Sequence, residues 1–218
     1  MYWRQISFCN PNSPIIIELI LFNDIVIIFL VGIIIFVLIF MIIANSSSIS
    51  STHSPIRQSI EFLWILYPGI ILIIIGVPSL FILYFVDEPV IKRNFSAKII
   101  AHQWYWEFEL PIMRDELSVY LDNNHILSNI YTPIFFLPYG IDHSLILTSD
   151  DTLHSIRLPS QGIKCDCIPG RLREVKIKAV GPSVNYGQCT EICGAFHSFI
   201  PFTLRFIRLN KFIETYYY

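Results

Sequence analysis

Residues 25–44 read IVIIFLVGIIIFVLIFMIIA, an uninterrupted apolar stretch without a charge or a proline. In an α-helix, 20 residues span about 30 Å, which is the hydrocarbon thickness of a bilayer. A second uncharged run covers residues 62–86 and contains Pro68 and Pro78, which membrane helices tolerate better than soluble helices do. The two runs predict a transmembrane helical hairpin over residues 25–86, with both chain ends on one side of the membrane.

The composition agrees with a membrane protein. Of the 218 residues, 54% are apolar and 15% are charged, whereas a typical soluble chain carries roughly 25% charged residues. The formal net charge of −2 gives no sign of nucleic-acid binding, so no nucleic-acid partner is expected. A secretory signal peptide fits poorly, because Glu18 interrupts the first apolar stretch and no small-residue cleavage site follows it.

We divide the chain into a leader (1–24), the hairpin (25–86, with spans at 25–44 and 62–86), a charged connector (87–97) and a C-terminal domain (98–218). Short runs rich in Ile, Val, Tyr and Phe alternate with Pro, Gly, Asn and Asp in this domain, and no long helical pattern interrupts them. Strands are predicted at residues 103–110, 134–137, 144–148, 174–180 and 202–209. The pattern predicts a membrane-anchored all-β protein whose domain is a small sandwich or barrel.

The residues that carry chemistry lie late in this domain, where residues 187–201 read GQCTEICGAFHSFIP. Cys189, Cys193 and His197 follow a C-x3-C-x3-H spacing, and a second histidine, His154, stands well before them. Two thiolates and two imidazoles suit copper or zinc rather than magnesium or calcium. The remote second histidine favours a loop-built site closed from another strand, as in blue-copper proteins. The alternative is a Cys189–Cys193 disulfide with two incidental histidines.

At this point the chain resembles subunit II of cytochrome c oxidase, of the mitochondrial, CuA-containing type. The stretches that carry the resemblance are AHQWYW at 101–106, DTLHS at 151–155, GIK at 162–164, IPGR at 168–171 and the run from Tyr186 through Pro201. The helix pair also matches, with Glu61, Pro78-Ser79 and Asp87-Glu88. The resemblance covers nearly the whole chain and implies that residues 98–218 form a cupredoxin-like Greek-key β-barrel.

The resemblance implies a dinuclear copper centre, CuA. Cys189 and Cys193 would bridge the two copper ions, His154 and His197 would each bind one of them, and the backbone carbonyl of Glu191 would supply a weak axial oxygen. Two bridging thiolates keep the copper ions close and share one electron between them, so both oxidation states need little rearrangement.

One ligand position departs from the family pattern. The family has a methionine where this chain has Ile200, which offers no lone pair to a metal, so an axial ligand that tunes the potential is missing. The chain contains 41 isoleucines and 3 methionines. Because some mitochondrial genetic codes read AUA as methionine where others read isoleucine, we hypothesise that Ile200 reflects the translation table.

The resemblance also implies roles outside the copper ligands. Trp104 would receive electrons from cytochrome c, Glu61 would stand at the start of a proton pathway in subunit I, and the Glu191 side chain would bind a magnesium or manganese ion shared with subunit I. The acidic residues that would dock the basic cytochrome c are Glu109, Asp150 and Asp151. The plainer alternatives are that Trp104 is a core or surface aromatic, that the acidic residues are solvated loop charges and that Glu61 complements the helix dipole. Cys165 and Cys167 are interpreted as small buried thiols rather than ligands.

The predicted protein therefore accepts electrons from reduced cytochrome c at CuA and passes them to heme in subunit I, where oxygen is reduced to water with proton pumping. It carries no heme itself. It would lie in the mitochondrial inner membrane beside the other oxidase subunits, with the C-terminal domain in the intermembrane space. Two alternatives stay open: a copper-free structural subunit, as in quinol oxidases, and a zinc-bound module without a redox role.

Overall fold

Two long apolar helices open the computed structural model, which describes residues 7–46, 58–87, 95–110 and 134–217. Helix α1 covers Pro14–Ser46 and helix α2 covers Gln58–Val86, and both are long and apolar enough to cross a membrane. Contacts divide the chain into two units: residues 18–85 form one, and residues 1–17 with residues 86–218 form the other. The hairpin's loop at residues 47–57 lies outside the described residues.

Helix α1 begins within the segment that the sequence analysis assigned to the leader. Ser13 caps it, since the Ser13 hydroxyl accepts a hydrogen bond from the backbone N–H of Ile16 at 3.2 Å, and Pro14 takes the first helical position. A serine cap followed by proline is a common helix start. The apolar run therefore marks the part of the helix suited to hydrocarbon. The helix itself starts earlier in the chain and includes the charged Glu18 and Asp24.

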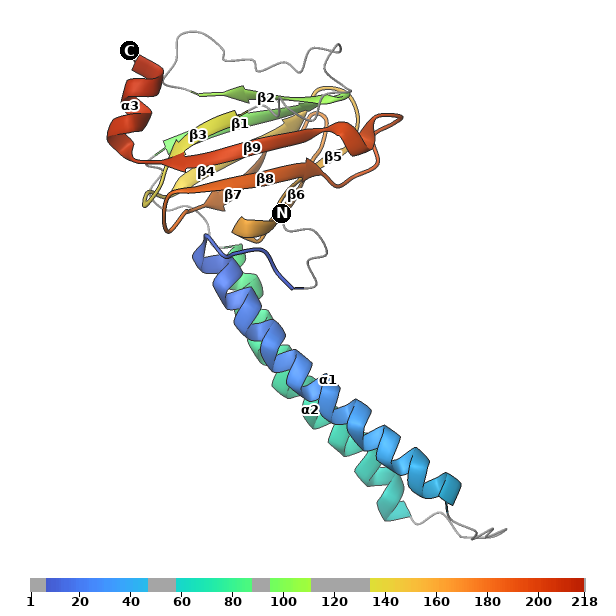
Figure 1. The fold of residues 1–218 in the computed structure, drawn as a ribbon. Coiled ribbons are helices and arrows are strands. Elements are labelled where there is room, and N and C mark those ends of the chain that lie inside the picture. Colours follow the sequence, from blue (N-terminus) through green and yellow to red (C-terminus); the bar gives the residue numbers. More distant parts are fainter. Residues whose placement is uncertain (1–6, 47–57, 88–94, 111–133, 218) are drawn as a thin grey trace. The chain divides into compact units, whose positions relative to one another are not determined.

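Nine described strands form two sheets in the β-domain (Figure 1). The four-stranded sheet has the order β2-β1-β4-β7, with β1 at Phe95–His102, β2 at Tyr105–Glu109, β4 at His143–Ser149 and β7 at Arg173–Ile177. The five-stranded sheet has the order β3-β9-β8-β5-β6, with β3 at Ile134–Pro138, β9 at Pro201–Ile207, β8 at Ser183–Cys189, β5 at His154–Leu158 and β6 at Ile163–Cys167. The β1/β4 and β3/β9 pairs are parallel and the remaining pairs are antiparallel.

The two sheets pack face to face through aromatic rings. Trp106 of β2 meets Phe202 of β9 at a ring-centroid distance of 5.5 Å, and Phe108 stacks on Phe135 at 4.8 Å. All four side chains are fully buried. The all-β class is confirmed, but the expected closed barrel is not: the described strands make two separate sheets, because neither sheet's edge strand pairs with an edge of the other.

Several elements differ from the predicted ones. Strand β1 starts at Phe95, inside the predicted connector, and Trp104 lies in the turn between β1 and β2 rather than within a strand. Strands β1, β5 and β8 were not predicted, β6 was predicted only as a strand through Cys165 and Cys167, and a short helix, α3 (Leu209–Tyr217), follows β9. Strand β8 escaped detection because it buries polar Asn185 and exposes apolar Tyr186, the reverse of the usual alternation.

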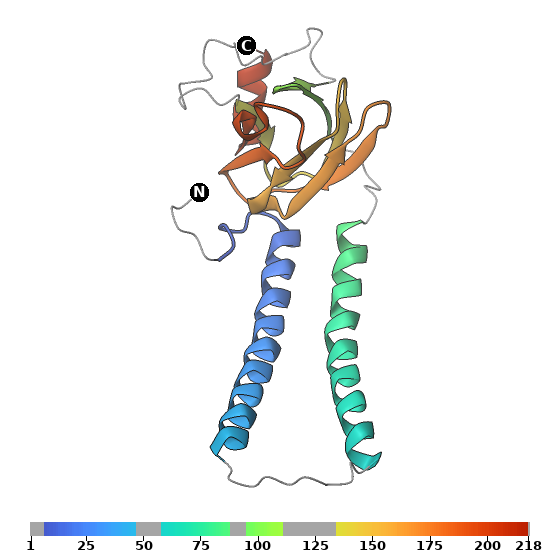
Figure 2. The same cartoon turned by 90° about the vertical axis from the view of Figure 1, so that its right-hand side faces the viewer.

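The segment before α1 is hydrogen-bonded to the β-domain. The Asn12 backbone N–H donates to the Ser160 carbonyl at 2.9 Å, and the Asn12 carbonyl accepts from the Val180 N–H at 3.0 Å. The Ser13 hydroxyl donates to the Gln161 carbonyl at 2.7 Å. Ser160 and Gln161 belong to η2 (Pro159–Gln161), the short turn of helix between β5 and β6. The segment that contacts η2 is the blue loop just before α1 in Figure 2. The first described residues therefore belong to the β-domain's unit.

Candidate metal centre

The predicted ligands converge because β5 and β8 are neighbours. His154 opens β5 and Cys189 closes β8, and the register pairs Ile156 of β5 with Cys189. The following loop, residues 190–200, brings Cys193 and His197 back toward the same place. This loop is closed at its base, where the Cys189 N–H donates to the Ile200 carbonyl at 3.3 Å.

Four donor atoms gather there. The Cys189 and Cys193 sulfurs lie 4.0 Å apart. The Nδ1 atom of His154 lies 3.8 Å from the Cys189 sulfur, and the Nδ1 atom of His197 lies 3.5 Å from the Cys193 sulfur. His154, Cys189 and Cys193 place their ligand atoms within 4.8 Å of one another. Both cysteines are free thiols, so the disulfide alternative does not describe this structure. A set of two thiols and two imidazoles fits a soft or borderline metal such as copper.

The pKa values of the two thiols are shifted in opposite directions. Burial raises the pKa of the Cys189 thiol, but hydrogen bonds with His154 and with nearby backbone outweigh burial and bring the pKa from 9.0 to about 6. Burial and the neighbouring Cys189 raise the pKa of the Cys193 thiol to about 12. One thiolate therefore forms readily, and the second needs a cation to stabilise it. That is the behaviour expected of a metal-binding thiol pair.

Asp151 orients His154. The Asp151 carboxylate accepts a hydrogen bond from His154 Nε2 at 2.9 Å and further bonds from the backbone N–H groups of Thr152 and Gln103. Burial acts to raise the pKa of Asp151, but these bonds outweigh it and the pKa is lowered. Burial acts to lower the pKa of His154, but its bonds with Cys189 and Asp151 outweigh it and the pKa is raised. With its Nε2–H committed to Asp151, a neutral His154 turns the Nδ1 lone pair toward Cys189.

Glu191 and Ile200 frame the two thiols. The Cys189 thiol donates to the Glu191 carbonyl at 3.3 Å, while the Glu191 side chain is exposed. The Ile200 side chain is 1% exposed within the same apolar cluster as Cys189 and Cys193. The Ile200 carbonyl also accepts from the Trp106 indole N–H at 3.2 Å. The backbone of residue 200 thus fixes the loop, and its side chain brings no donor atom.

Trp104 lies against the loop that carries the thiols. Its ring meets Phe196 edge-on at 4.8 Å. Gly194 has a φ of +128°, and a Cβ atom there would lie 3.2 Å from Trp104 Cζ2. The neighbouring Gln103 side chain donates to the Cys193 carbonyl at 2.7 Å. The turn at residues 103–104 therefore packs against the loop that carries Cys193 and His197.

Comparisons with known proteins identify the family to which the chain belongs. The family model for the periplasmic domain of cytochrome c oxidase subunit II matches residues 95–207, and the model for its transmembrane domain matches residues 1–82. Cytochrome c oxidase subunit 2 of Albinaria caerulea is 36% identical over 221 residues, which cover 97% of each chain. The chain belongs to the cytochrome c oxidase subunit II family.

A second full-length relative and a solved periplasmic domain are also similar to this chain. Cytochrome c oxidase subunit 2 of Albinaria turrita is 35% identical over 97% of this chain and 97% of the relative. The solved periplasmic domain of subunit II of cytochrome oxidase from Bradyrhizobium japonicum is 29% identical, with a TM-score of 0.48, and covers 59% of this chain and 97% of that domain. As a subunit II, this chain is part of a membrane-bound oxidase complex and works with other oxidase subunits.

The predicted docking acids have three different surroundings. Glu109 forms an ion pair with Lys98 at 2.8 Å, and the Asp151 carboxylate is paired with the His154 imidazole. The Asp150 side chain is 77% exposed, with His102 at 3.8 Å. Glu61 lies in the first turn of α2. The contact between Asp151 and His154 was missed at the level of sequence, although the three-residue spacing between them was a usable signal.

Proposed function

We propose that this subunit binds a dinuclear copper centre and receives electrons from cytochrome c. The observation that carries the proposal is that two free thiols lie 4.0 Å apart and each has an imidazole nitrogen beside it, at 3.8 Å for Cys189 and 3.5 Å for Cys193. Cys189, Cys193, His154 and His197 would hold the two copper ions, and the Glu191 backbone carbonyl beside Cys189 would assist them. Bound in this way, a copper pair supplies a one-electron redox centre.

The chain's own residues prepare the site. Asp151 holds the Nε2 proton of His154, so Nδ1 is free to bind a metal. The lowered pKa of Cys189 supplies a thiolate at neutral pH. The buried surroundings of Cys189 and Cys193 keep bulk water from the sulfurs, which limits their oxidation. Ile200 contributes no ligand, so the site would work without an axial thioether.

Electrons would arrive through Trp104, whose indole lies against the loop that holds Cys193 and His197. Cytochrome c would dock beside it. Asp150 is the docking acid that is 77% exposed, since Glu109 is paired with Lys98 and Asp151 is bonded to His154. Electrons would then pass to heme in subunit I, where oxygen is reduced to water with proton pumping.

The remaining assignments concern neighbouring subunits. The exposed Glu191 side chain would bind magnesium or manganese together with subunit I. Glu61, at the start of α2, would open a proton pathway in subunit I. We place the complex in the mitochondrial inner membrane, with the β-domain in the intermembrane space. Support comes from the two membrane helices and from the Albinaria relatives.

Metal analysis and electron paramagnetic resonance of the full chain in detergent test the proposal. Two copper ions per chain that share one unpaired electron are the expected result. Zinc at this site with no paramagnetic signal would favour the zinc module, and no retained metal would favour the structural subunit. Ile200→Met distinguishes a site that lacks only its thioether from one that does not bind copper at all.

A further inference from the structure

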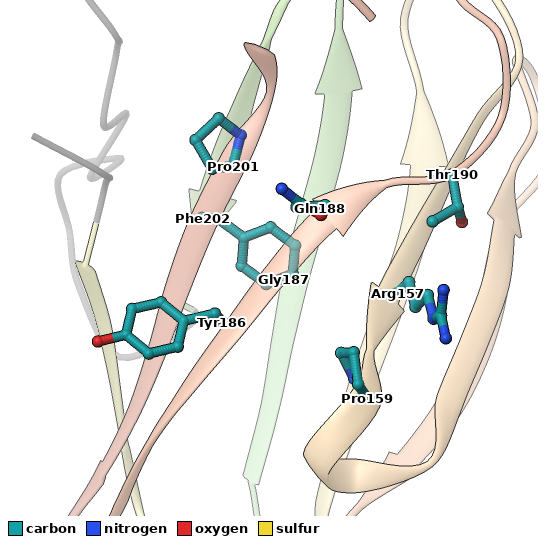
Figure 3. Close-up of a pocket in the computed structure, with 8 residues that line it drawn as sticks. All are labelled: Arg157, Pro159, Tyr186, Gly187, Gln188, Thr190, Pro201 and Phe202. Atoms are coloured by element: carbon teal, nitrogen blue, oxygen red, sulfur yellow. The ribbon is translucent and has the colours of Figure 1, made fainter. Parts of the chain in front are cut away.

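The five-stranded sheet carries a second hollow that lies outside the metal centre. It is a pocket of about 370 Å³ on the outer face of the sheet, bordered by residues of β5, β8, β9 and η2 (Figure 3). The side chains that matter here are Arg157, Pro159, Tyr186, Gln188 and Pro201. In Figure 3, Tyr186 lies on one side of the pocket and Arg157 lies on the other. The pocket is therefore largely apolar, with one guanidinium at its edge.

The side of the pocket formed by β5, next to β6, carries unbalanced positive charge. The register places Arg157 directly opposite Lys164 of β6 on one side and Gln188 of β8 on the other. Residues directly opposite one another point to the same face of a sheet, and like charges in such a pair are destabilising. Within the described ranges of the chain, neither Arg157 nor Lys164 has an ion pair or a side-chain hydrogen bond. Asp166, on the same face of β6, forms no ion pair with them either. An anion placed here would remove the repulsion.

The surroundings of the pocket are apolar and exposed. Tyr186 is 53% exposed, Val184 is 45% exposed and Ile134 is 45% exposed. The register connects Ile134 to Tyr186 through Thr203, so these side chains belong to one face. Exposed apolar surface of this kind marks an interaction site, and tyrosine and arginine are enriched at the centres of such sites. Because Arg157, Tyr186 and Gln188 are all exposed, a small ligand would stay open to water, whereas a protein surface would cover the pocket.

We propose that this face of the sheet docks another subunit of the oxidase complex, which inserts an acidic side chain into the pocket between Arg157 and Gln188. The carboxylate would pair with the guanidinium and lie near the Lys164 ammonium. The apolar part of the partner surface would cover Tyr186 and Val184. The inference requires that the chain belongs to an oxidase complex and does not depend on copper.

Carbodiimide cross-linking of the intact, purified oxidase complex tests the contact. The reagent activates a carboxylate, which then forms an amide with a nearby lysine amine as the reagent leaves as a urea. We expect mass spectrometry to find Lys164 joined to an aspartate or glutamate of another subunit. Phenylglyoxal should modify Arg157 several-fold more slowly in the complex than in the isolated full chain. Lys98 is the internal control, because its ion pair with Glu109 should give the same cross-link in both preparations.

Variants sharpen the test. In a complex that carries Arg157→Glu, the Lys164 cross-link should be lost, whereas Arg171→Glu, on an exposed turn, should leave it unchanged. Equal reactivity of Arg157 in the complex and in the isolated chain, without a Lys164 cross-link, would overturn the proposal. A cross-link to a second copy of this chain would overturn it too. So would protection of Arg157 that disappears on gel filtration and returns with inorganic phosphate, since the occupant would then be a free anion.

Discussion

The Asp151 carboxylate has more hydrogen-bond donors than an amide could satisfy. Oδ1 accepts from His154 Nε2 and from the Thr152 N–H, and Oδ2 accepts from the Gln103 N–H. In Asp151→Asn, one oxygen becomes an NH₂ group that can only donate. That group would face either the Gln103 N–H or the pair formed by His154 and Thr152. The variant therefore loses at least one hydrogen bond, together with the negative charge beside His154.

The size of the effect follows from the burial of His154. Its side chain is 0% exposed, so water cannot replace the lost bond. Removing the hydrogen-bond partner of a metal-binding histidine typically weakens metal binding by roughly 10- to 100-fold. That range corresponds to about 1.4–2.7 kcal/mol, which agrees with roughly 1.5–3 kcal/mol for a hydrogen bond to a charged group. We expect Asp151→Asn to lower copper affinity by about 10- to 100-fold.

Competition with a copper chelator measures this affinity on the full chain in detergent. Asp150→Asn is the matched control, because it removes the same charge from a side chain that is 77% exposed and not bonded to His154. Unchanged affinity in Asp151→Asn would refute the reasoning. An equal loss in both variants would also refute it, since net charge and not the hydrogen bond would then explain the result.

Three further variants or conditions test the loop and the sheet beneath it. Ile200→Met should change the unfolding free energy by less than about 1.5 kcal/mol, because the swap conserves volume, and it should alter the spectrum of the copper-loaded chain. Gly187→Ala should destabilise the domain by about 1–3 kcal/mol through overpacking, since its Cβ would lie 2.0 Å from Phe202 Cζ; Phe202→Leu should relieve part of that loss in a double-mutant cycle. In the copper-free chain the Cys189 thiol should contribute a gain in stability as pH rises from about 6 to 9, because its pKa is lowered from 9.0 to about 6, while the raised pKa of His154 contributes a loss that begins near pH 6.5; above pH 9 the pKa of Cys193, raised to about 12, should lower stability. Thermal unfolding at each pH measures these trends.

Each of these expectations has an outcome that contradicts it. A large drop in the unfolding midpoint of Ile200→Met would mean that the cavity around residue 200 does not accept a thioether. Strictly additive losses in Gly187→Ala and Phe202→Leu would mean that the two residues do not compete for space. A stability profile between pH 6 and 9 that Cys189→Ser leaves unchanged would exclude a contribution from the Cys189 thiolate.

Sequence patterns predicted the thiol and imidazole residues of the site better than the residues that hold them in place. Cys189, Cys193, His154 and His197 were predicted from residue type and from the family resemblance, and the fold brings them together. Asp151 was predicted only as a docking charge, because a sequence gives the sign of a side chain and not the direction of its hydrogen bonds. The contact with His154 appears only when the turn before β5 folds back.

The sequence predicted the fold class but not whether the strands close into a barrel. Apolar runs revealed both membrane helices, but the start of α1 depended on the Ser13 cap rather than on hydropathy. Apolar runs bounded by turn residues revealed strands such as β4, whereas β8 was missed because it buries Asn185 and covers Gly187 with the Phe202 ring. Whether nine strands close into a barrel depends on edge pairing, which composition does not encode.

The hydrogen bonds of Asn12 and Ser13 have a consequence for how the protein is made. Both residues precede the first membrane span, whereas the partners of Asn12 (Ser160 and Val180) and of Ser13 (Gln161) follow the second. These bonds can form only if the short segment before α1 is exported to the same side of the bilayer as the β-domain. Export of that segment is therefore a condition for completing the domain. A chain whose first span is inserted in the opposite direction would leave the Ser160 and Gln161 carbonyls of η2 without these donors.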